Sequence, residues 1–192
     1  MTRRSRQFKY STDDPDMALI QAMVKGHVPA LETLYARYGP GLLTYLKSRL
    51  EDSDLAEEVL QDVMLAAWKG AARFRGECRV RTWLMAITRN RAINAHRRRH
   101  QPISLPLDWA PPAILSQASH SERLDQVLDL EMALSSLPDQ TRETIELVFY
   151  HGLSAKEAAY IQKIAPGTVK SRLHRAMNYL RKLMTPEYPS DE

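Results

Sequence analysis

The sequence predicts an all-α protein made of two small helical bundles joined by a flexible linker. Apolar residues recur at steps of three and four through most of the 192 residues, and no stretch of useful length alternates like a strand. Prolines gather between residues 101 and 121, where Lys and Arg do not occur, which is typical of an extended linker. We therefore expect an N-terminal tail at 1–12, a first domain at 13–100, the linker at 101–121, a second domain at 122–185 and a C-terminal tail at 186–192.

The first half of the first domain carries several helix start and stop signals. Asp14-Pro15 is expected to begin a helix as cap and first helical residue, and Gly26 to end it. Pro29 begins a second helix. The run Gly39-Pro40-Gly41 is expected to break that helix before the chain becomes helical again over Leu42–Leu50.

Two longer helices are predicted in the rest of this domain. Ser53 is expected to cap the first of them, near acidic residues that suit the positive end of a helix dipole. Its apolar stripe consists of Leu55, Val59, Val63 and Ala67. After a loop with Arg75-Gly76, a helix spans about Val80 to Arg99. Its predicted buried stripe consists of Val80, Trp83, Leu84 and Ile87.

The second domain shows clear helix boundaries. Ser154 and Glu157 form a capping box, in which the Ser side chain bonds the backbone of the Glu and the Glu side chain reaches back. Proline begins and glycine follows the helix before it, and Pro166 begins the last helix. We expect helices at 122–136, 138–151, 154–162 and 166–184.

Positive charge is concentrated in two separate blocks. Residues 63–100 hold ten bases and one acid, which gives 10 − 1 = +9, and residues 154–184 hold seven bases and one acid, which gives 7 − 1 = +6. The net charge of the whole chain is only +4, so the remainder is acidic. Two basic blocks on a nearly balanced chain indicate two contacts with a polyanion.

The basic block of the second domain fits a helix-turn-helix. A short capped helix, the turn Gln162-Lys163-Ile164 and a longer basic helix follow one another. The apolar residues expected to face the core are Val169, Leu173, Ala176, Leu180 and Leu183. The opposite face carries Lys170, Ser171, His174, Arg175 and Asn178, which can donate hydrogen bonds to base edges and phosphates. The alternative is an ordinary solvated basic face, but the capped helix and tight turn favour DNA binding.

The basic block of the first domain combines a loop with a helix. The loop Arg75–Arg81 has small and basic residues that suit an unstacked base. The helix after it carries Arg89, Asn90, Arg91 and Asn94, then Arg97 to Arg99. Amide and guanidinium groups suit base recognition and phosphate neutralisation. A solvated helix end would explain the last three arginines equally well, and Trp83 is more typical of a core than of a stacking platform.

Enzyme, metal and membrane roles find little support. The chain has seven Gly and neither a phosphate-cradling loop nor an HExxH motif. His96 and His100 have ligand spacing, but the three arginines between them repel a cation, so no metal and no cofactor are expected. The single cysteine, Cys78, fits a reducing cytoplasm, and we favour an incidental thiol over a redox role. No apolar run approaches the ~20 residues of a membrane helix, so we expect a cytoplasmic protein without membrane insertion.

Two sets of residues carry a resemblance to a known family. The sequence AEEVLQDV at 56–63, Trp68, FRG at 74–76 and WLMAITRN at 83–90 resembles sigma domain 2. The pair LP at 137–138, Arg142, GLS at 152–154 and GTVKSRLHRA at 167–176 resembles sigma domain 4. In this order and spacing, from about residue 13 to residue 184, the chain is similar to the extracytoplasmic-function (ECF) sigma factors of bacterial RNA polymerase.

This resemblance implies a non-enzymatic transcription initiation factor with three binding surfaces. Core polymerase, through the clamp helices of its largest subunit, would bind Glu58, Gln61, Asp62, Leu65 and Lys69. The minus-ten element of promoter DNA would be recognised and melted by Arg75, Arg79, Arg81, Trp83, Arg89, Asn90, Asn94 and Arg97. The minus-thirty-five element would be read by Thr168, Lys170, Ser171, Arg172, His174 and Arg175. The resemblance also implies a linker threaded through the polymerase and an inhibitory anti-sigma factor.

Two other functions were weighed against this one. A DNA-binding regulator with a ligand-sensing first domain would leave the Gln61-Asp62 surface and the second basic block unexplained. A nuclease would need clustered carboxylates beside the basic helices, where Glu77 is nearly alone.

At the helix-turn-helix turn, Lys163 stands where Gly is usual in the family and Gln162 where an apolar residue is usual. A Lys in a left-handed position costs on the order of 1 kcal/mol.

Overall fold

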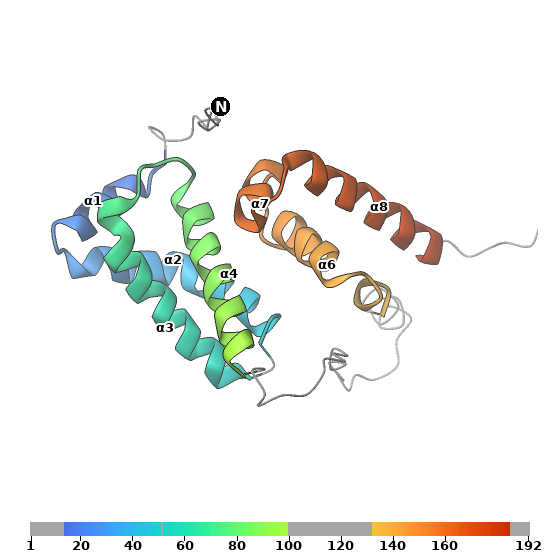
Figure 1. Ribbon diagram of the computed structural model, residues 1–192. Coiled ribbons are helices and arrows are strands. Elements are labelled where there is room, and N and C mark those ends of the chain that lie inside the picture. The colour runs from blue at the N-terminus through green and yellow to red at the C-terminus, as the bar shows by residue number, and fades with distance from the viewer. Residues whose placement is uncertain (1–13, 51, 100–131, 185–192) are drawn as a thin grey trace, which may run out of the picture. The chain divides into compact units, whose positions relative to one another are not determined.

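The computed structural model describes residues 14–50, 52–99 and 132–184, and every regular element in these ranges is a helix (Figure 1). This confirms the all-α prediction. The chain divides into two compact units, Met1–Pro106 and Leu107–Glu192, each with its own core. The predicted linker, both predicted tails and residues 122–131 of the predicted helix 122–136 lie outside the described residues.

Unit 1 is a bundle in which α3 lies between two other helices. Its elements are α1 (Met17–Val24), α2 (Val28–Lys47), α3 (Ser53–Gly70), the 3-10 turn η1 (Ala71–Arg73) and α4 (Val80–Arg99). Helix α3 packs against both α2 and α4, and α1 packs against α2 and η1 (Figure 1). The largest fully buried side chains of this unit are Leu34, Tyr45, Leu46, Val63 and Leu84. The bounds of α4 agree with the sequence prediction.

The predicted break at Gly39-Pro40-Gly41 is wrong, because α2 continues through Pro40 to Lys47. Proline removes one backbone donor and usually kinks a helix. Here the residues on both sides of it, Leu34 before and Tyr45 after, are fully buried in the same core. Tertiary packing of one continuous apolar face therefore outweighs the local cost of the proline.

Two predicted helix caps in unit 1 are also wrong. Helix α1 begins at Met17, and Asp14 does not cap it. Ser53, the predicted cap, is instead the first residue of helix α3, and the cap is Asp52, whose carboxylate accepts the N–H groups of Asp54 and Leu55 at 2.9 and 3.1 Å. An ionised carboxylate is a stronger acceptor than the Ser hydroxyl at this positive end of the helix.

The buried stripes of α3 and α4 follow the prediction only in part. Val59, Val63 and Ala67 are buried as expected, whereas Leu55 is half-buried. On α4, Val80 and Leu84 are buried, while Trp83 and Ile87 are half-buried. The remaining interior positions of α4 are small or adaptable residues, namely Thr82, Met85, Thr88, Ala92 and Ala95.

Unit 2 is a smaller bundle arranged around its last helix. Residues 132–135 are helical, followed by α6 (Asp139–Ile145), the π-helical turn η2 (Glu146–Tyr150), α7 (Ala155–Gln162) and α8 (Pro166–Met184). Helix α8 packs against α6 and α7. The core includes Leu147, Leu153, Ala158, Ile161 and Val169. The predicted helix 138–151 is present, but its final turn is π-helical and leaves Phe149 and Tyr150 exposed.

Candidate nucleic-acid interfaces

The helix-turn-helix of unit 2 is built from local signals. Ser154 and Glu157 form the predicted capping box: the Glu157 N–H donates to the Ser154 hydroxyl at 3.3 Å, and the Ser154 N–H donates to the Glu157 carboxylate at 2.9 Å. Helix α7 then ends at Lys163, which adopts the left-handed conformation with φ 58° and ψ 39°. The chain turns through this residue and enters α8 at Pro166. The structure thus has the predicted turn with the predicted strained residue.

The core-facing side of α8 sets which residues point outward. Val169, Ala176 and Leu180 are buried, and Ala176 and Leu180 pack against Ala133 and Leu137. The prediction that Leu183 faces the core is wrong, because its side chain is 54% exposed. Leu183 lies in the last turn of α8 and does not belong to the core cluster that contains Leu180.

The opposite face of α8 displays polar groups to solvent. Lys170, Ser171, His174 and Arg175 are exposed, and Thr168 is half-buried. The contacts of these side chains stay within the helix: Arg175 Nε donates to the Ser171 carbonyl at 3.3 Å, and Asn178 Nδ2 lies 3.0 Å from His174 Nε2. Such weak local contacts leave the donors available for a nucleic acid.

Arg172 differs from these neighbours. Its side chain is half-buried, and its Nη2 donates to Gln140 Oε1 on α6 at 2.6 Å. The guanidinium is therefore held at the flank of the exposed face. This position suits contact with a phosphate better than insertion between base edges.

A buried polar cluster behind the turn was missed by the sequence analysis. Gln162 is only 6% exposed; its Nε2 donates to Glu143 Oε2 at 3.0 Å, and its Oε1 accepts the Thr144 hydroxyl at 3.0 Å. Glu143 and Thr144 are also buried. The amide thus satisfies polar groups of α6 at the residue that precedes the left-handed turn. The departure of Gln162 from an apolar residue was the available signal.

The loop before α4 in unit 1 alternates between buried and exposed positions. Gly76, Cys78 and Val80 are buried, whereas Arg75 and Arg79 are exposed. Gly76 has φ 68°, a conformation that strains other residues. Buried anchors on one side of the chain therefore present the two arginines on the other side.

The base of this loop is closed by an aromatic pair. Phe74 and Trp83 stack with ring centroids 4.7 Å apart, and a Cβ on Gly70 would approach the Trp83 ring to 3.3 Å. Trp83 is half-buried, so its ring both supports the loop and keeps an accessible part. Arg81, also half-buried, lies in the same first turn of α4.

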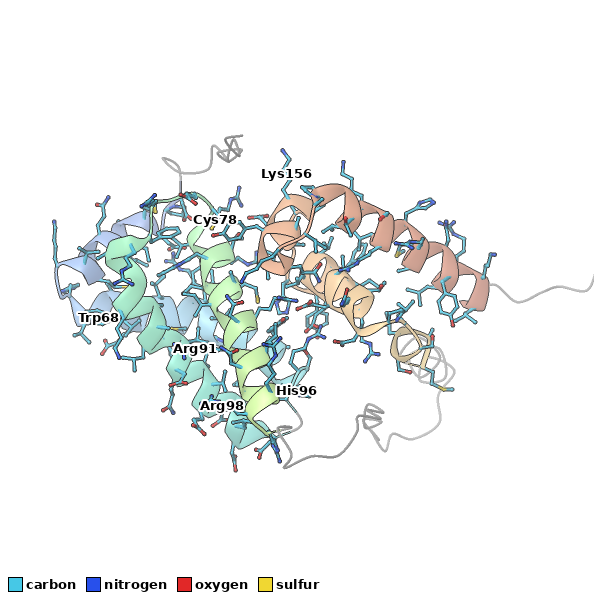
Figure 2. The ribbon with its side chains drawn as sticks, viewed as in Figure 1. Trp68, Cys78, Arg91, His96, Arg98 and Lys156 are labelled. Atoms are coloured by element: carbon cyan, nitrogen blue, oxygen red, sulfur yellow. The ribbon has the colours of Figure 1, made fainter. Side chains whose placement is uncertain are left out.

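The remaining predicted minus-ten residues lie farther along α4. Arg89 is half-buried, and Asn90 is exposed. Toward the end of the helix, Arg91, Asn94, Arg97 and Arg98 line an open cavity of about 340 Å³. Figure 2 shows Arg91 and Arg98 on this half of α4, and Cys78 in the loop at the other end. From Trp83 to Arg97 the helix rises roughly 21 Å, so the two ends of this set of residues cannot contact the same nucleotide.

The predicted polymerase surface lies on the side of α3 away from its core. Glu58, Gln61, Leu65 and Lys69 are exposed, and Leu65 is an apolar side chain with 49% of its surface free. Asp62 is half-buried and lies 4.0 Å from Arg91 Nη1 on α4. The predicted polymerase surface and the basic cavity therefore share an ion pair at their boundary.

A second missed cluster joins the start of the described chain to α2 and α4. Asp14 Oδ2 accepts the Val80 N–H at 2.7 Å. Asp16 is 2% exposed, and its carboxylate accepts hydrogen bonds from Arg37 and Tyr38. Burial raises the pKa of the Tyr38 phenol, and the nearby Asp14 carboxylate raises it further. The phenol therefore stays protonated at neutral pH and donates to Asp16.

Other chemistry finds no support among the described residues. They contain no group of three or more side chains that could hold a metal ion, and His100 lies outside them. Cys78, the one cysteine of the chain, is buried in the loop, so an intrachain disulfide cannot form. Within the described ranges, no helix combines the length and apolar character needed to cross a membrane.

Comparison with known proteins matches both units to one family. The family model of sigma-70 region 2 matches residues 34–101, and that of sigma-70 region 4 matches residues 128–180. The ECF RNA polymerase sigma factor RpoE of Cereibacter sphaeroides is 30% identical over 177 residues, 91% of this chain and 98% of the relative. The ECF RNA polymerase sigma factor SigM of Mycobacterium tuberculosis is 31% identical over 169 residues, 88% of this chain and 84% of the relative.

Solved structures show the same fold. The structure of CnrH in complex with the cytosolic domain of CnrY aligns with a TM-score of 0.64 at 24% identity, and covers 88% of this chain and 96% of that one. The sigma factor RpoE in complex with the anti-sigma factor NepR, from Bartonella quintana, aligns with a TM-score of 0.58 at 27% identity. That alignment covers 82% of this chain and 98% of the other.

Proposed function

The chain belongs to the ECF-type RNA polymerase sigma factors with sigma-70 regions 2 and 4, and from this premise we propose how its residues divide the work of transcription initiation. Like its family, it is not an enzyme, since the polymerase performs the chemistry. In our proposal, unit 1 docks on core polymerase and opens the minus-ten element, while α8 reads the minus-thirty-five element as duplex. The domains would span residues 13–100 and 122–185, with 101–121 as the linker.

The observation that carries the proposal is the exposed polar face of α8. Lys170, Ser171 and Arg175 are exposed opposite the buried Val169 and Ala176. A helix-turn-helix places the N-terminal part of its second helix in the major groove. The planar guanidinium of Arg175 can bond a guanine edge twice, which discriminates by about 1–3 kcal/mol. Arg172, held by Gln140 at the flank, is assigned to phosphate.

Strand opening is assigned to the loop and the first half of α4. Arg75 and Arg79 are exposed, and Trp83, in the first turn of α4, is half-buried. Cations and an aromatic face are what an unstacked base requires. The exposed amide of Asn90, two turns further on, supplies both donor and acceptor groups. Asn94 and Arg97, roughly 16 and 21 Å from Trp83 along the helix, are assigned to the DNA backbone beyond the melted segment.

Polymerase docking is assigned to the outer face of α3. Leu65 provides an apolar anchor, with Gln61 and Glu58 around it. An interface typically combines such an apolar centre with a polar rim. We assign this face to the clamp helices of the largest subunit, as the family membership implies.

An anti-sigma factor is proposed as the regulatory partner, and the cytoplasm as the compartment. The support is that the related sigma factor of Bartonella quintana was solved with an anti-sigma factor bound. Unit 2 also exposes Phe149 and Tyr150, at 61% and 77%, which a partner protein can cover. Recovery of a regulatory protein with the chain from its host, in addition to polymerase, is the expected result.

The central test assembles the full chain with core polymerase and transcribes a promoter library at two salt concentrations. Arg175→Ala is expected to relax base preference at one or two minus-thirty-five positions. Arg172→Ala is expected to weaken all promoters about equally and to reduce the salt dependence. The matched control is Lys182→Ala, since Lys182 is exposed two turns further along α8; this change is expected to leave base preference unaltered. Uniform scaling by Arg175→Ala would contradict the assignment.

The docking surface needs a design that respects the ion pair at its edge. Replacing Asp62 also releases Arg91 toward the basic cavity, so its effect on DNA cannot be separated from its effect on polymerase. Gln61→Ala combined with Leu65→Ala avoids this and is expected to weaken core binding without unfolding. Glu32→Ala, an exposed change on α2, is the control. Unchanged affinity of the double variant for core polymerase would contradict the docking surface.

A further inference from the structure

The start of helix α4 is bonded to a residue far away in the sequence. The residue before the helix is Arg79, whose side chain has no hydrogen-bond acceptor. The first N–H of the helix, that of Val80, donates to Oδ2 of Asp14, 66 positions earlier, at 2.7 Å. The distance is short for an N–H···O bond and typical of a charge-assisted one.

Asp14 is itself held in place from two sides. Its second oxygen, Oδ1, accepts the Asp16 N–H at 3.0 Å, which fixes the orientation of the carboxylate. Asp16, 2% exposed, is bound by Arg37 and Tyr38 of α2. Pro15 joins the two aspartates and restricts the backbone between them. The segment Asp14-Pro15-Asp16, here named the clip, thus connects α2 to the first residue of α4.

The clip bonds the chain at the point where the Arg75–Arg81 loop enters α4. Val80 is the last of the buried anchors, after Gly76 and Cys78, that present Arg75 and Arg79 to solvent. The other end of the loop is held by the stacking of Phe74 on Trp83. Any shift in the start of α4 therefore moves Arg79 directly. The clip and the aromatic pair fix the two ends of one recognition loop.

We propose that Asp14 is a positioning residue for promoter opening, because its carboxylate fixes the start of α4 and with it the arginines of the loop. This inference rests on the proposed role of the loop in strand opening. Asp14 touches no DNA in this proposal. It sets the geometry in which Arg75 and Arg79 meet an unstacked base, and geometric precision of that kind governs the rate of a step more than the affinity of the complex.

The test follows strand opening by permanganate reactivity in complete holoenzyme on a promoter that the wild-type chain opens. Asp14→Ala is expected to slow opening about tenfold, while affinity for core polymerase and closed-complex binding stay unchanged. Asp14→Asn keeps one acceptor oxygen for the Val80 N–H but turns its NH2 group toward the Asp16 N–H, so it is expected to recover the rate only in part. A general loss of stability would lower all three readouts together, which would overturn the proposal.

A matched control removes a cap of the same kind elsewhere. Asp52→Ala deletes the carboxylate that caps α3, at the end of the bundle where Asp52 pairs with Arg99. It is expected to lower stability without slowing strand opening. Equal slowing by Asp52→Ala and Asp14→Ala would overturn the proposal, as would wild-type opening by Asp14→Ala.

Arg79→Ala separates this proposal from the one on which it rests. If Arg79→Ala slows opening and Asp14→Ala does not, the role of the clip is refuted and the role of the loop stands. If Arg79→Ala and Arg75→Ala both open promoters at the wild-type rate, the assignment of the loop is refuted and the clip proposal falls with it.

Discussion

Helices α4 and α8 both display arginines, but they hold these side chains by different means. On α4, Arg91 and Arg99 reach across to acidic residues of the α3 region, Asp62 at 4.0 Å and Asp52 at 3.1 Å. On α8, Arg175 and Arg181 bond within their own helix, to the Ser171 carbonyl and to Asn178. DNA that reaches Arg91 or Arg99 must therefore replace an acidic partner, whereas DNA that reaches Arg175 competes with a bond inside the helix; Arg172 of α8 is instead bonded to Gln140 of α6.

The buried faces of α4 and α8 also differ in how far they extend along each helix. The interior side of α4 is buried along its length, from Val80 through Leu84 to Ala95. The interior side of α8 thins toward its end, where Leu180 is 7% exposed and Leu183 is 54% exposed. We infer that unit 1 is the rigid frame that a strand-opening loop requires, and that unit 2 is a lighter support for one reading helix.

The largest expected effect compares one leucine from each core. Leu84→Ala is expected to destabilise unit 1 by about 2–5 kcal/mol, because Leu84 is fully buried between α4 and its neighbours. Leu180→Ala should cost unit 2 about 2 kcal/mol, at the low end of the same range. Hydrogen exchange of the full chain measures both, through amides of α3 and α4 in one case and of α8 in the other. Equal losses would show that the two cores are equally tight.

The next effect concerns the buried amide of unit 2. Gln162→Ala removes the donor to Glu143 and the acceptor for Thr144, and is expected to destabilise unit 2 by about 1–3 kcal/mol. Gln162→Leu keeps the volume but loses both bonds, so it should also destabilise. Exchange of α7 amides is the measurement. Gln21→Ala, on an exposed position of α1, is the control and should change nothing.

A smaller effect on stability is expected from residues with positive φ, which differ between the two units. Among the described residues with positive φ, those of unit 1 are Gly26 and Gly76, whereas unit 2 has Gly152 and Lys163. Lys163→Gly is expected to stabilise unit 2 by about 0.5–1 kcal/mol, since Gly relieves the strain at φ 58°. Gly76→Ala should destabilise unit 1 by about 1–2 kcal/mol. A destabilising Lys163→Gly, measured by urea denaturation, would contradict this account of the turn.

The smallest effect is an acid dependence confined to unit 1. The Leu55 N–H that bonds the carboxylate lowers the pKa of Asp52 below its ordinary value of 3.8, with Asp54 and Arg99 adding to the effect. A lowered folded-state pKa contributes stability that is present above pH 3.8 and is lost as the pH falls below it. Asp52→Asn should therefore make the free energy of unfolding of unit 1 fall less as the pH drops below 3.8, without changing the stability of α8. If the pH dependence of unit 1 below 3.8 is the same in the variant and the wild type, the role of Asp52 as a cap is contradicted.

The sequence predicted the elements whose signals are local and failed where partners are distant. The bounds of α4, the capping box at Ser154 and the left-handed Lys163 all follow from residues within a few positions of one another. The continuity of α2 through Pro40 depends on a core contributed by other helices. The bonds of Gln162 depend on Glu143, which local patterns do not place beside it.

The candidate site shows the same division. The exposed face of α8 could be predicted from helical spacing, since one buried face determines the opposite one. The distance between Trp83 and Arg97 along α4 could also have been predicted from helix length. The cap from Asp14 to Val80 spans 66 residues and has no local signature, and Asp14-Pro15 carries a strong but misleading one for a helix start.

The burial of Cys78 has a practical consequence for measuring motion. The chain contains one cysteine, and that residue is 5% exposed within the loop that presents Arg75 and Arg79. A thiol reagent can modify it only when the loop leaves its packed position. The labelling rate of the unaltered protein therefore times loop opening directly, and its change on adding core polymerase or single-stranded DNA would show which of the two holds the loop closed.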